Sequence, residues 1–302
     1  MGDHVDINRI IDLITFTNIP NNATVTQVKH EEDDDYYGVW KIEYGSQSYI
    51  IKESKGNEAK IHTLVSKLVK NGVPHLYEII TAGEKQYLVM EYADGENLTK
   101  CNREKLILAL DALISVQKAT WGAFNIEDGE SSFAESLKRR INRGKYLNDP
   151  ILEEAYESFL SRYRSTPRAL CHDDLLPFNI IATEDRAYLI DWEIGGALPY
   201  PTSFARLIAH TSSDEDTFLY MTKEDKSFAT RYYYDNLLKE KGIAYGEWIN
   251  TLEYFTLYEY CEWVYVGNKY GTQDGELYKK YFPLAKSLAE RILISEKGKT
   301  TK

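Results

Sequence analysis

The sequence lacks any long apolar run. No stretch approaches the roughly 20 residues that a helix needs to cross a bilayer. The first residues, MGDHVDINRI, show no signal-peptide pattern, and position 6 is not the Ser or Thr of a myristoylation signal. Only three cysteines occur, Cys101, Cys171 and Cys261, and they lie too far apart to indicate a zinc site or a disulfide framework. These absences predict a cytoplasmic protein that does not bind membranes.

Dense clusters of basic residues are absent too. The chain has 36 Lys and Arg against 47 Asp and Glu, a net charge of −11. A nucleic-acid-binding surface needs a basic face, so nucleic acid is not expected as a partner. The acid excess favours solubility first and a cationic small molecule second. The 43% of hydrophobic residues is typical of a globular protein, and a length of 302 residues predicts two lobes.

The first part of the chain has the pattern of a small sheet. Runs rich in Val, Ile, Tyr and Thr at 23–30, 38–45 and 46–54 predict three strands, with Gly45-Ser46 as a hairpin turn. Residues 56–72 carry apolar side chains at helical spacing and end at Asn71-Gly72. Two more strands are predicted at 75–83 and 85–93. The order is therefore three strands, one helix and two strands.

The rest of the chain is predicted to be mostly helical. Helices are expected over 106–117, 133–147 and 150–165, and again over most of 203–295. Between them, residues 179–193 indicate two short strands joined by a turn. An antiparallel sheet with one helix, followed by a larger helical lobe, is an α+β fold with a cleft between the lobes, where binding pockets commonly form.

Three polar groups stand out at one point of this pattern. The stretch CHDDLLPFN, residues 171–179, contains Asp174 and Asn179, and Asp191 follows the apolar strand AYLI. Asp, Asn and Pro favour turns, so a plain loop is one interpretation. Carboxylate and carbonyl oxygens also suit hard cations. On that interpretation Asn179 and Asp191 hold Mg²⁺ and Asp174 accepts a proton from a hydroxyl, and phosphoryl transfer needs little else.

These motifs resemble a known family. HDDLLPFNII followed by YLIDWE is similar to the catalytic and metal loops of the aminoglycoside phosphotransferase and choline kinase family, with its H-x-D-x-x-x-x-N and D-[WF]-E patterns. Lys52 in YIIKES and Glu58 in NEAKIHTLV match a phosphate-binding lysine and the helix glutamate that holds it. The resemblance covers roughly residues 20 to 210. It implies the bilobal protein-kinase-like fold, with a nucleotide-binding lobe over 1–93 and a catalytic and substrate-binding lobe over 94–302.

The resemblance also implies roles for single residues. Asp174 is expected as the catalytic aspartate, with His172 bracing its loop through hydrogen bonds. Asn179 and Asp191 are expected as Mg²⁺ ligands. The nucleotide, ATP or GTP, is expected to contact the following residues: Lys52, Glu58, Met90, Glu91 and Ala93.

Two departures from the family pattern affect the site. Ser203 stands where members carry an aspartate at a helix start, although Ser can also cap a helix. The loop between the first two strands has one glycine, Gly38, and the five acids Glu31 to Asp35. Glycine-rich loops place amide groups on phosphates, whereas acids there repel phosphates unless they point to solvent.

An acidic pair lies in the C-terminal region. Residues 254–266 read YFTLYEYCEWVYV, a pattern typical of a buried helix, with Glu259 and Glu262 on one face and Trp263 next to them. The stretch contains no Lys or Arg, and buried carboxylates without partners are costly. One interpretation is a basic partner from elsewhere, such as Arg139, Arg140 or Arg231. The other is a substrate site, in which the carboxylates hold ammonium groups and Trp263 adds a cation–π contact.

Three functions are compatible with these features. The first is an ATP- or GTP-dependent kinase that phosphorylates a hydroxyl of a small, cationic substrate, acting as a monomer or homodimer. The second is a choline- or ethanolamine-type kinase. The third is a pseudokinase that binds a nucleotide or sugar, which the acidic loop and Ser203 favour and the intact Lys52, Asp174, Asn179 and Asp191 oppose.

Overall fold

The N-terminal part of the protein is a five-stranded antiparallel sheet. The computed structural model describes residues 7–29, 36–122 and 129–300, so the acidic run Glu31 to Asp35 lies outside the described residues. The strands are β1 (Thr24–Lys29), β2 (Tyr36–Tyr44), β3 (Gln47–Glu53), β4 (Leu76–Ala82) and β5 (Lys85–Glu91), in the order β1-β2-β3-β5-β4. Gly45, with φ 58°, makes the predicted hairpin turn between β2 and β3. The predicted succession along the chain of three strands, one helix and two strands is confirmed.

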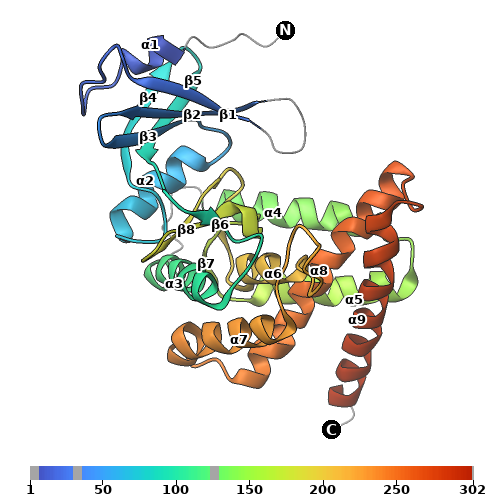
Figure 1. Ribbon diagram of the computed structural model, residues 1–302. Coiled ribbons are helices and arrows are strands. Elements are labelled where there is room, and N and C mark those ends of the chain that lie inside the picture. Colours follow the sequence, from blue (N-terminus) through green and yellow to red (C-terminus); the bar gives the residue numbers. More distant parts are fainter. Residues whose placement is uncertain (1–6, 30–35, 123–128, 301–302) are drawn as a thin grey trace.

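The two faces of this sheet are covered by different helices. Alternate side chains such as Trp40, Ile42 and Ile51 bury one face together with Ile10 of a short helix, α1 (Ile7–Ile11), which the sequence pattern did not indicate. The other face packs Leu88 and Met90 against Ala59 of α2 (Glu58–Leu68). Figure 1 shows the sheet as the upper part of the molecule, with α2 between it and the helices below.

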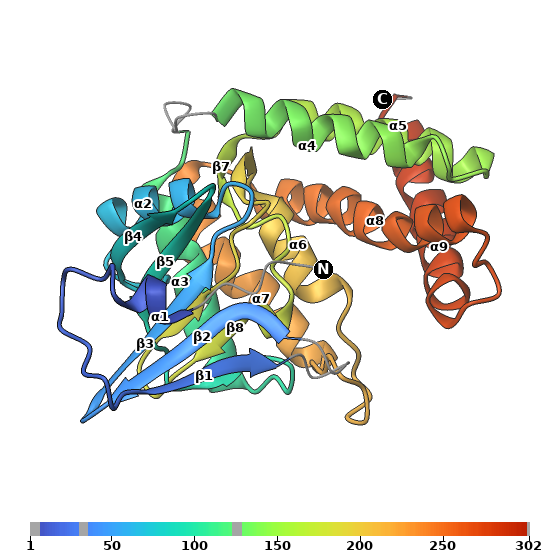
Figure 2. The same cartoon turned by 90° about the horizontal axis from the view of Figure 1, so that it is seen from above.

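The C-terminal part is mainly helical and holds the largest core. Its helices are α3 (Arg103–Ala119), α4 (Gly129–Gly144), α5 (Pro150–Ser165), α6 (Pro201–Ala209), α7 (Lys223–Tyr233), α8 (Tyr245–Tyr270) and α9 (Glu276–Thr300), with short π and 3₁₀ turns at Tyr234–Leu238, Lys239–Lys241 and Pro177–Asn179. Helix α8 packs against α5, α6 and α9, and in Figure 2 it lies beneath α4. The predicted α+β fold is confirmed.

Short strands carry the loops between these helices. Strands β6 (Glu96–Asn97), β8 (Ile180–Ala182) and β9 (Ala187–Leu189) form one small sheet, and β7 (Arg168–Cys171) pairs with β10 (Gly196–Pro199). The hairpin of β8 and β9 was predicted. The strands β6, β7 and β10 were not, because no short turn joins any of them to its partner strand, whereas the turn between β8 and β9 marks a hairpin.

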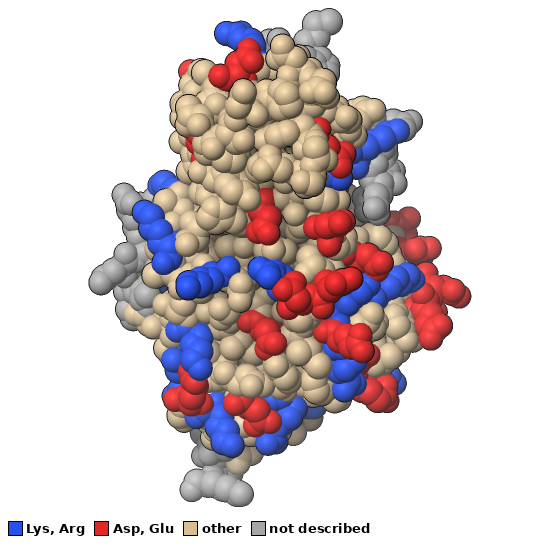
Figure 3. Space-filling view, turned by 60° about the vertical axis from the view of Figure 1, so that its left-hand side comes forward, with Lys and Arg blue, Asp and Glu red and all other residues tan. Residues whose placement is uncertain are grey.

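The charge of the surface and the apolar character of the helices bear on nucleic-acid binding and on membrane insertion. On the face drawn in Figure 3, Lys and Arg of the described residues are interspersed with Asp and Glu and form no broad basic patch. Among the described helices, none combines the length and the apolar character that crossing a membrane requires. The lobe boundary at residue 93 stays a prediction. The described sheet ends with β5 at Glu91, and the first long helix after it begins at Arg103.

Candidate active site

His172 is the first residue after β7 and begins the loop 172–176, which the resemblance implies to be the catalytic loop. Its ring is fully buried beside Trp192, and Nε2 contacts the carbonyl oxygen of Ile190 at 2.5 Å. Its backbone N–H donates to Oγ of Ser203 at 2.9 Å. Burial lowers the pKa of the imidazole, so the ring is neutral at pH 7 and Nε2 is the donor to Ile190. His172 therefore joins the catalytic loop to the residue before Asp191 and to α6, which is the bracing geometry that the resemblance implies.

The next residue, Asp173, has a bridging position that the sequence did not reveal. Its backbone has a positive φ of 43°. The carboxylate is 5% exposed and contacts Arg140 at 2.5 Å and Arg139 at 2.9 Å. Arg140, itself 2% exposed, lies against the ring of Tyr163. These contacts attach the loop to α4. Arg139 and Arg140, which the sequence suggested as partners of Glu259 and Glu262, therefore bind Asp173 instead.

Asp174 binds an arginine of a different helix, Arg206 of α6, and its side chain is 34% exposed. Its backbone carbonyl accepts from Nδ2 of Asn179 at 2.9 Å, and the carbonyl of Asn179 accepts from the backbone N–H of Ile190 at 3.0 Å. Asp191, the residue after Ile190, therefore lies beside Asn179. The structure thus brings Asp174, Asn179 and Asp191 together at one end of the β8–β9 hairpin, as the spacing predicts.

Lys52 on β3 connects the sheet to this end of the hairpin. Its Nζ lies 2.6 Å from Oε1 of Glu58 and 2.7 Å from Oδ1 of Asp191. Although burial opposes its charge, Glu58 and Asp191 raise the pKa of Lys52. Burial raises the pKa of Glu58, which is 0% exposed, against the opposing effect of the lysine. A phosphate group placed at Lys52 would therefore meet a firmly held positive charge.

A close backbone approach keeps the two parts of the protein in contact here. The N–H of Asn57 donates to the carbonyl of Glu193 at 3.0 Å. Gly56 has φ 51°, and a Cβ at this position would lie 2.3 Å from that carbonyl oxygen. Only glycine fits this approach. The start of α2 is thus fixed against the loop that follows Asp191.

The predicted hinge residues lie at the end of β5. Met90 is buried, and the side chain of Glu91 accepts from the hydroxyl of Tyr188 at 2.9 Å and from the backbone N–H of His75 at 3.1 Å. Within the described chain, the backbone N–H of Ala93 has no hydrogen-bond partner. This amide is therefore open to an acceptor on a purine ring, and Glu91 holds the segment in place.

The donor set beside Lys52 fits Mg²⁺. Asp191 offers a carboxylate that is 45% exposed, and its positive φ of 65° turns the loop at this residue. Asn179 uses its amide nitrogen on the carbonyl of Asp174, which leaves the amide oxygen as a ligand. Oxygen donors of this kind are those that hard divalent cations prefer. A hydroxyl-bearing substrate beside Asp174 would thus lie next to charges able to hold a nucleotide phosphate.

The acidic pair on α8 has basic partners from elsewhere in the fold, as the first of the two interpretations expects. Nη1 of Arg206 lies 2.8 Å from Glu259 and 2.5 Å from Glu262. Arg143 contacts the other oxygen of Glu262 at 2.7 Å. The two glutamates share a face, as predicted, but the partners suggested from the sequence were wrong. Those arginines are engaged elsewhere: Arg139 and Arg140 with Asp173, and Arg231 with Asp235.

The two glutamates of this pair differ in burial. Glu259 is 2% exposed, whereas Glu262 and Trp263 are half-buried. Burial opposes ionisation of Glu259, but Arg206 and His210 overcome it and lower the pKa of the carboxyl to about 2. The arginine that binds both glutamates also contacts Asp174, so the cluster adjoins the catalytic loop. Arg206 was missed from the sequence, although it lies three positions after Ser203 and therefore on the same face of α6.

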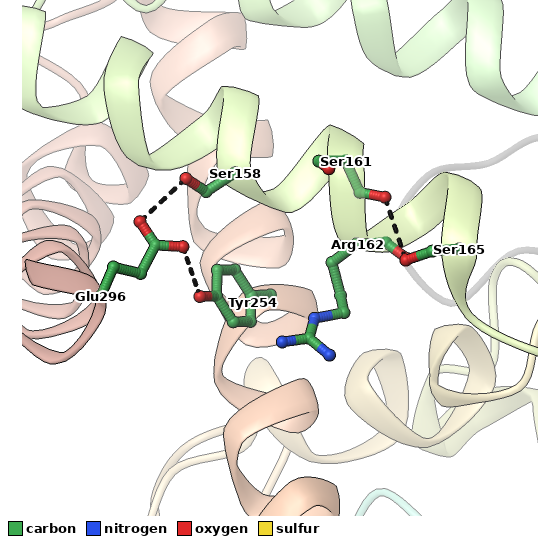
Figure 4. Close-up of a pocket in the computed structure, with 6 residues that line it drawn as sticks. All are labelled: Ser158, Ser161, Arg162, Ser165, Tyr254 and Glu296. Atoms are coloured by element: carbon green, nitrogen blue, oxygen red, sulfur yellow. Dashed lines mark hydrogen bonds between the residues drawn. The ribbon is translucent and has the colours of Figure 1, made fainter. Parts of the chain in front are cut away.

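A separate pocket lies between α5, α8 and α9. It is lined by four residues of α5 together with Tyr254 and Glu296, and Figure 4 shows the Glu296 carboxylate between the hydroxyls of Ser158 and Tyr254. The α5 residues are Ser158, Ser161, Arg162 and Ser165. None of the predicted site residues lines it, so it is not the expected nucleotide site.

Comparison with known proteins bears on the residues described above. Residues 48–233 match a family model described as the phosphotransferase enzyme family. The matched range includes Lys52, Asp174, Asn179 and Asp191 and ends before α8. No curated protein matches the chain by sequence.

Solved structures share the fold at low sequence identity. Aminoglycoside-3′-phosphotransferase of type VIII is 20% identical with a TM-score of 0.52, over 78% of this chain and 93% of that one. A thermostable mutant of aminoglycoside phosphotransferase APH(4)-Ia, in a ternary complex with ADP and hygromycin B, is 11% identical with a TM-score of 0.52, over 90% and 94%. A GDP complex of an aminoglycoside 2′-phosphotransferase-IIIa mutant is 12% identical with a TM-score of 0.54, over 89% and 92%. The predicted bilobal, protein-kinase-like fold is therefore confirmed.

Proposed function

Because the chain belongs to the phosphotransferase enzyme family, we propose that it transfers the terminal phosphate of ATP or GTP to a hydroxyl group of a small cationic molecule. The observation that carries this proposal is the position of Lys52 between Glu58 and Asp191, at 2.6 and 2.7 Å. A charged lysine, a metal-binding pair and an aspartate next to them are the parts that phosphoryl transfer requires.

Each residue of the site has a separate role in the proposed reaction. Lys52 holds the phosphates of the nucleotide, and Glu58 fixes the lysine. Asp174, on the exposed side of the loop, orients the acceptor hydroxyl and takes its proton. Asn179 and Asp191 would hold Mg²⁺, which supplies neutralisation of the phosphate charge when bound. His172, neutral and buried, keeps the two loops in register and moves no proton.

The nucleotide is proposed from the hinge and from two structural neighbours. The free amide of Ala93 and the adjacent Met90 suit a purine base. One neighbour contains ADP and another contains GDP, so both bases are consistent with this fold. The preference of this chain for one base then depends on its contacts at the hinge. A competition assay between ATP and GTP measures this preference.

The acceptor is proposed to be cationic for three reasons. The chain has a net charge of −11, which attracts cations over a distance. Glu262 and Trp263, both half-buried, lie in the cluster that adjoins Asp174. Both oxygens of Glu262 are bound by Arg206 and Arg143, so Trp263 is the residue of this pair that offers a contact, its indole face, to an ammonium group. A neighbour binds hygromycin B, and aminoglycosides carry amino groups that are protonated at neutral pH. Glu259 serves this site indirectly, through Arg206.

A phosphorylation screen tests the proposal. The protein is incubated with Mg²⁺ and ATP or GTP, and aminoglycosides, macrolides, choline, ethanolamine and neutral sugars are assayed separately for phosphate transfer. We expect transfer to a cationic acceptor and a loss of about 10²–10⁴-fold in turnover for Asp174→Asn, with nucleotide binding retained. Nucleotide binding without transfer to any acceptor would favour the pseudokinase interpretation, and near-normal turnover of the variant would remove Asp174 from the mechanism.

A further inference from the structure

Arg206 contacts the catalytic aspartate directly. Its Nε lies 3.0 Å and its Nη2 2.8 Å from the same oxygen, Oδ1 of Asp174. The arginine extends from α6 and is 14% exposed, whereas the carboxylate is 34% exposed. We propose that Arg206 is a positioning residue for the phosphoryl transfer: it holds Oδ1 of Asp174 and thereby presents Oδ2 to the acceptor hydroxyl. This inference rests on the proposed function.

The arginine is itself held on its far side. Nη1 contacts Glu259 at 2.8 Å, Glu262 at 2.5 Å and Nε2 of His210 at 3.1 Å. His210 and Glu259 also contact each other at 3.0 Å. A guanidinium is a planar fork with fixed donor directions, so the two carboxylates bound to one nitrogen determine where the other two nitrogens point. The cluster on α8 and the end of α6 therefore set the position of the carboxylate of Asp174.

A metal ion is the other cation that this cluster suggests. One ligand atom each from His210, Glu259 and Glu262 lie within 4.8 Å of one another. Nη1 of Arg206, however, is within hydrogen-bond distance of all three. The guanidinium thus occupies the position that a metal ion would need, and the charge that balances the two carboxylates is supplied by the protein.

The position of Asp174 matters because its role depends on geometry. A general base has to reach the proton that it takes at hydrogen-bond distance, and a misplacement of about 1 Å can reduce turnover about 10²-fold. Asp174 lies on a loop and has an exposed carboxylate, so its backbone alone leaves the side-chain torsions free. The contact with Arg206 is the interaction that the structure shows on this carboxylate, and it removes that freedom.

The test compares Arg206→Gln with Arg143→Gln. Both substitutions remove an arginine paired with Glu262, but only Arg206 contacts Asp174. Crystal structures of the wild type and both variants show where the carboxylate of Asp174 lies. Turnover is followed with Mg²⁺ and ATP and with water as the acceptor, a probe that requires no knowledge of the substrate. Asp174→Asn and the double variant Asp174→Asn/Arg206→Gln complete a double-mutant cycle.

We expect Arg206→Gln to displace the carboxylate and to lower kcat about 10²-fold, with the KM for ATP unchanged because Lys52 and the hinge are intact. Arg143→Gln should leave the carboxylate in place. The double variant should be no slower than Asp174→Asn alone, since Arg206 acts through Asp174. If Arg206→Gln does not fold, Arg206→Lys replaces it. The lysine keeps the charge but not the fork, so partial displacement and a smaller loss are expected.

Two results would overturn the inference. One is an unmoved Asp174 carboxylate in the Arg206 variant. The other is losses in the two single variants that multiply in the double variant, which would mean that Arg206 acts independently of Asp174. A wild-type protein that hydrolyses no ATP and phosphorylates no acceptor defeats the proposed function instead. The crystal structures then still decide whether Arg206 positions Asp174.

Discussion

Two neighbouring aspartates in the catalytic loop have different surroundings. The side chain of Asp173 is 5% exposed and bound by Arg139 and Arg140, whereas that of Asp174 is 34% exposed and bound by Arg206. The arginines of Asp173 come from α4, and that of Asp174 comes from α6. A buried, doubly paired carboxylate serves the loop's structure, and an exposed one can meet a substrate. At the scale of single residues, therefore, burial and not residue type distinguishes the two aspartates.

The two proposed metal ligands differ in charge, which leads to a prediction. Asp191→Ala removes a full negative charge from a site for a hard cation, whereas Asn179→Ala removes a neutral amide. We expect the first substitution to weaken Mg²⁺ binding more than the second, as measured by calorimetric titration of the nucleotide-bound protein with Mg²⁺. Asp191→Asn is the matched control that keeps the shape of the side chain. Equal losses for the two alanine variants would indicate a different set of ligands.

At the scale of elements, α6 holds the loop 172–176, which is predicted to be catalytic. Ser203 and Arg206 lie three positions apart and so on one face of the helix. Ser203 accepts from the N–H of His172, and Arg206 contacts Asp174. The aspartate that the family places at the helix start is thus replaced by a hydroxyl that still bonds the loop. This departure therefore does not leave the loop unanchored.

Ser203→Ala tests the strength of this anchor. The substitution leaves the buried N–H of His172 without its acceptor, which costs about 1–3 kcal/mol of unfolding free energy. Thr202→Val is the matched control, because the hydroxyl of Thr202 is buried next to Ser203 and has no partner within the described residues. We expect the control to be neutral or slightly stabilising. Equal urea midpoints for the two variants would show that the Ser203 hydroxyl does not hold the loop.

At the scale of the whole molecule, one ion-pair chain joins the two lobes. Lys52 comes from β3, Glu58 from α2, and Asp191 from the loop after β9. Because burial raises the pKa of Glu58 above its ordinary value of 4.5, the native state binds a proton more readily than the unfolded chain does. The free energy of unfolding therefore falls as the pH rises from 4.5 to the native pKa. The charge of Lys52 lowers the native pKa of Glu58 and so keeps this pH range narrow.

Lys52→Ala should widen that interval. Without the lysine, the pKa of Glu58 rises further, and each additional unit costs about 1.4 kcal/mol of stability above the new pKa. We expect the variant to lose more stability than the wild type between pH 5 and pH 8, as measured by urea unfolding at both values. The double variant Lys52→Ala/Glu58→Gln should lose this additional pH dependence. A pH dependence equal to that of the wild type would mean that Lys52 does not support ionisation of Glu58. Nucleotide binding should weaken in both variants.

The sequence by itself determined the longer elements of the sheet region and the local part of the site. Apolar periodicity and turn residues place β1 to β5 and α2 without reference to the rest of the chain. Asp174, Asn179 and Asp191 are separated only by one short hairpin, so their spacing already indicates that they meet. Lys52 and Glu58 are only six positions apart. Local geometry is sufficient to predict these contacts, because only a few backbone torsion angles lie between the residues that meet.

Only the tertiary structure decided which distant groups meet. Arg206 and Glu259 are 53 positions apart, and their contact depends on how α6 packs against α8. Periodicity shows which face of a helix is apolar, but not which neighbour covers it. The sequence therefore indicated that Glu259 and Glu262 need a partner and could not select Arg206 and Arg143 over other arginines. The selection is made by packing across the core, where one side chain can satisfy carboxylates from two elements at once.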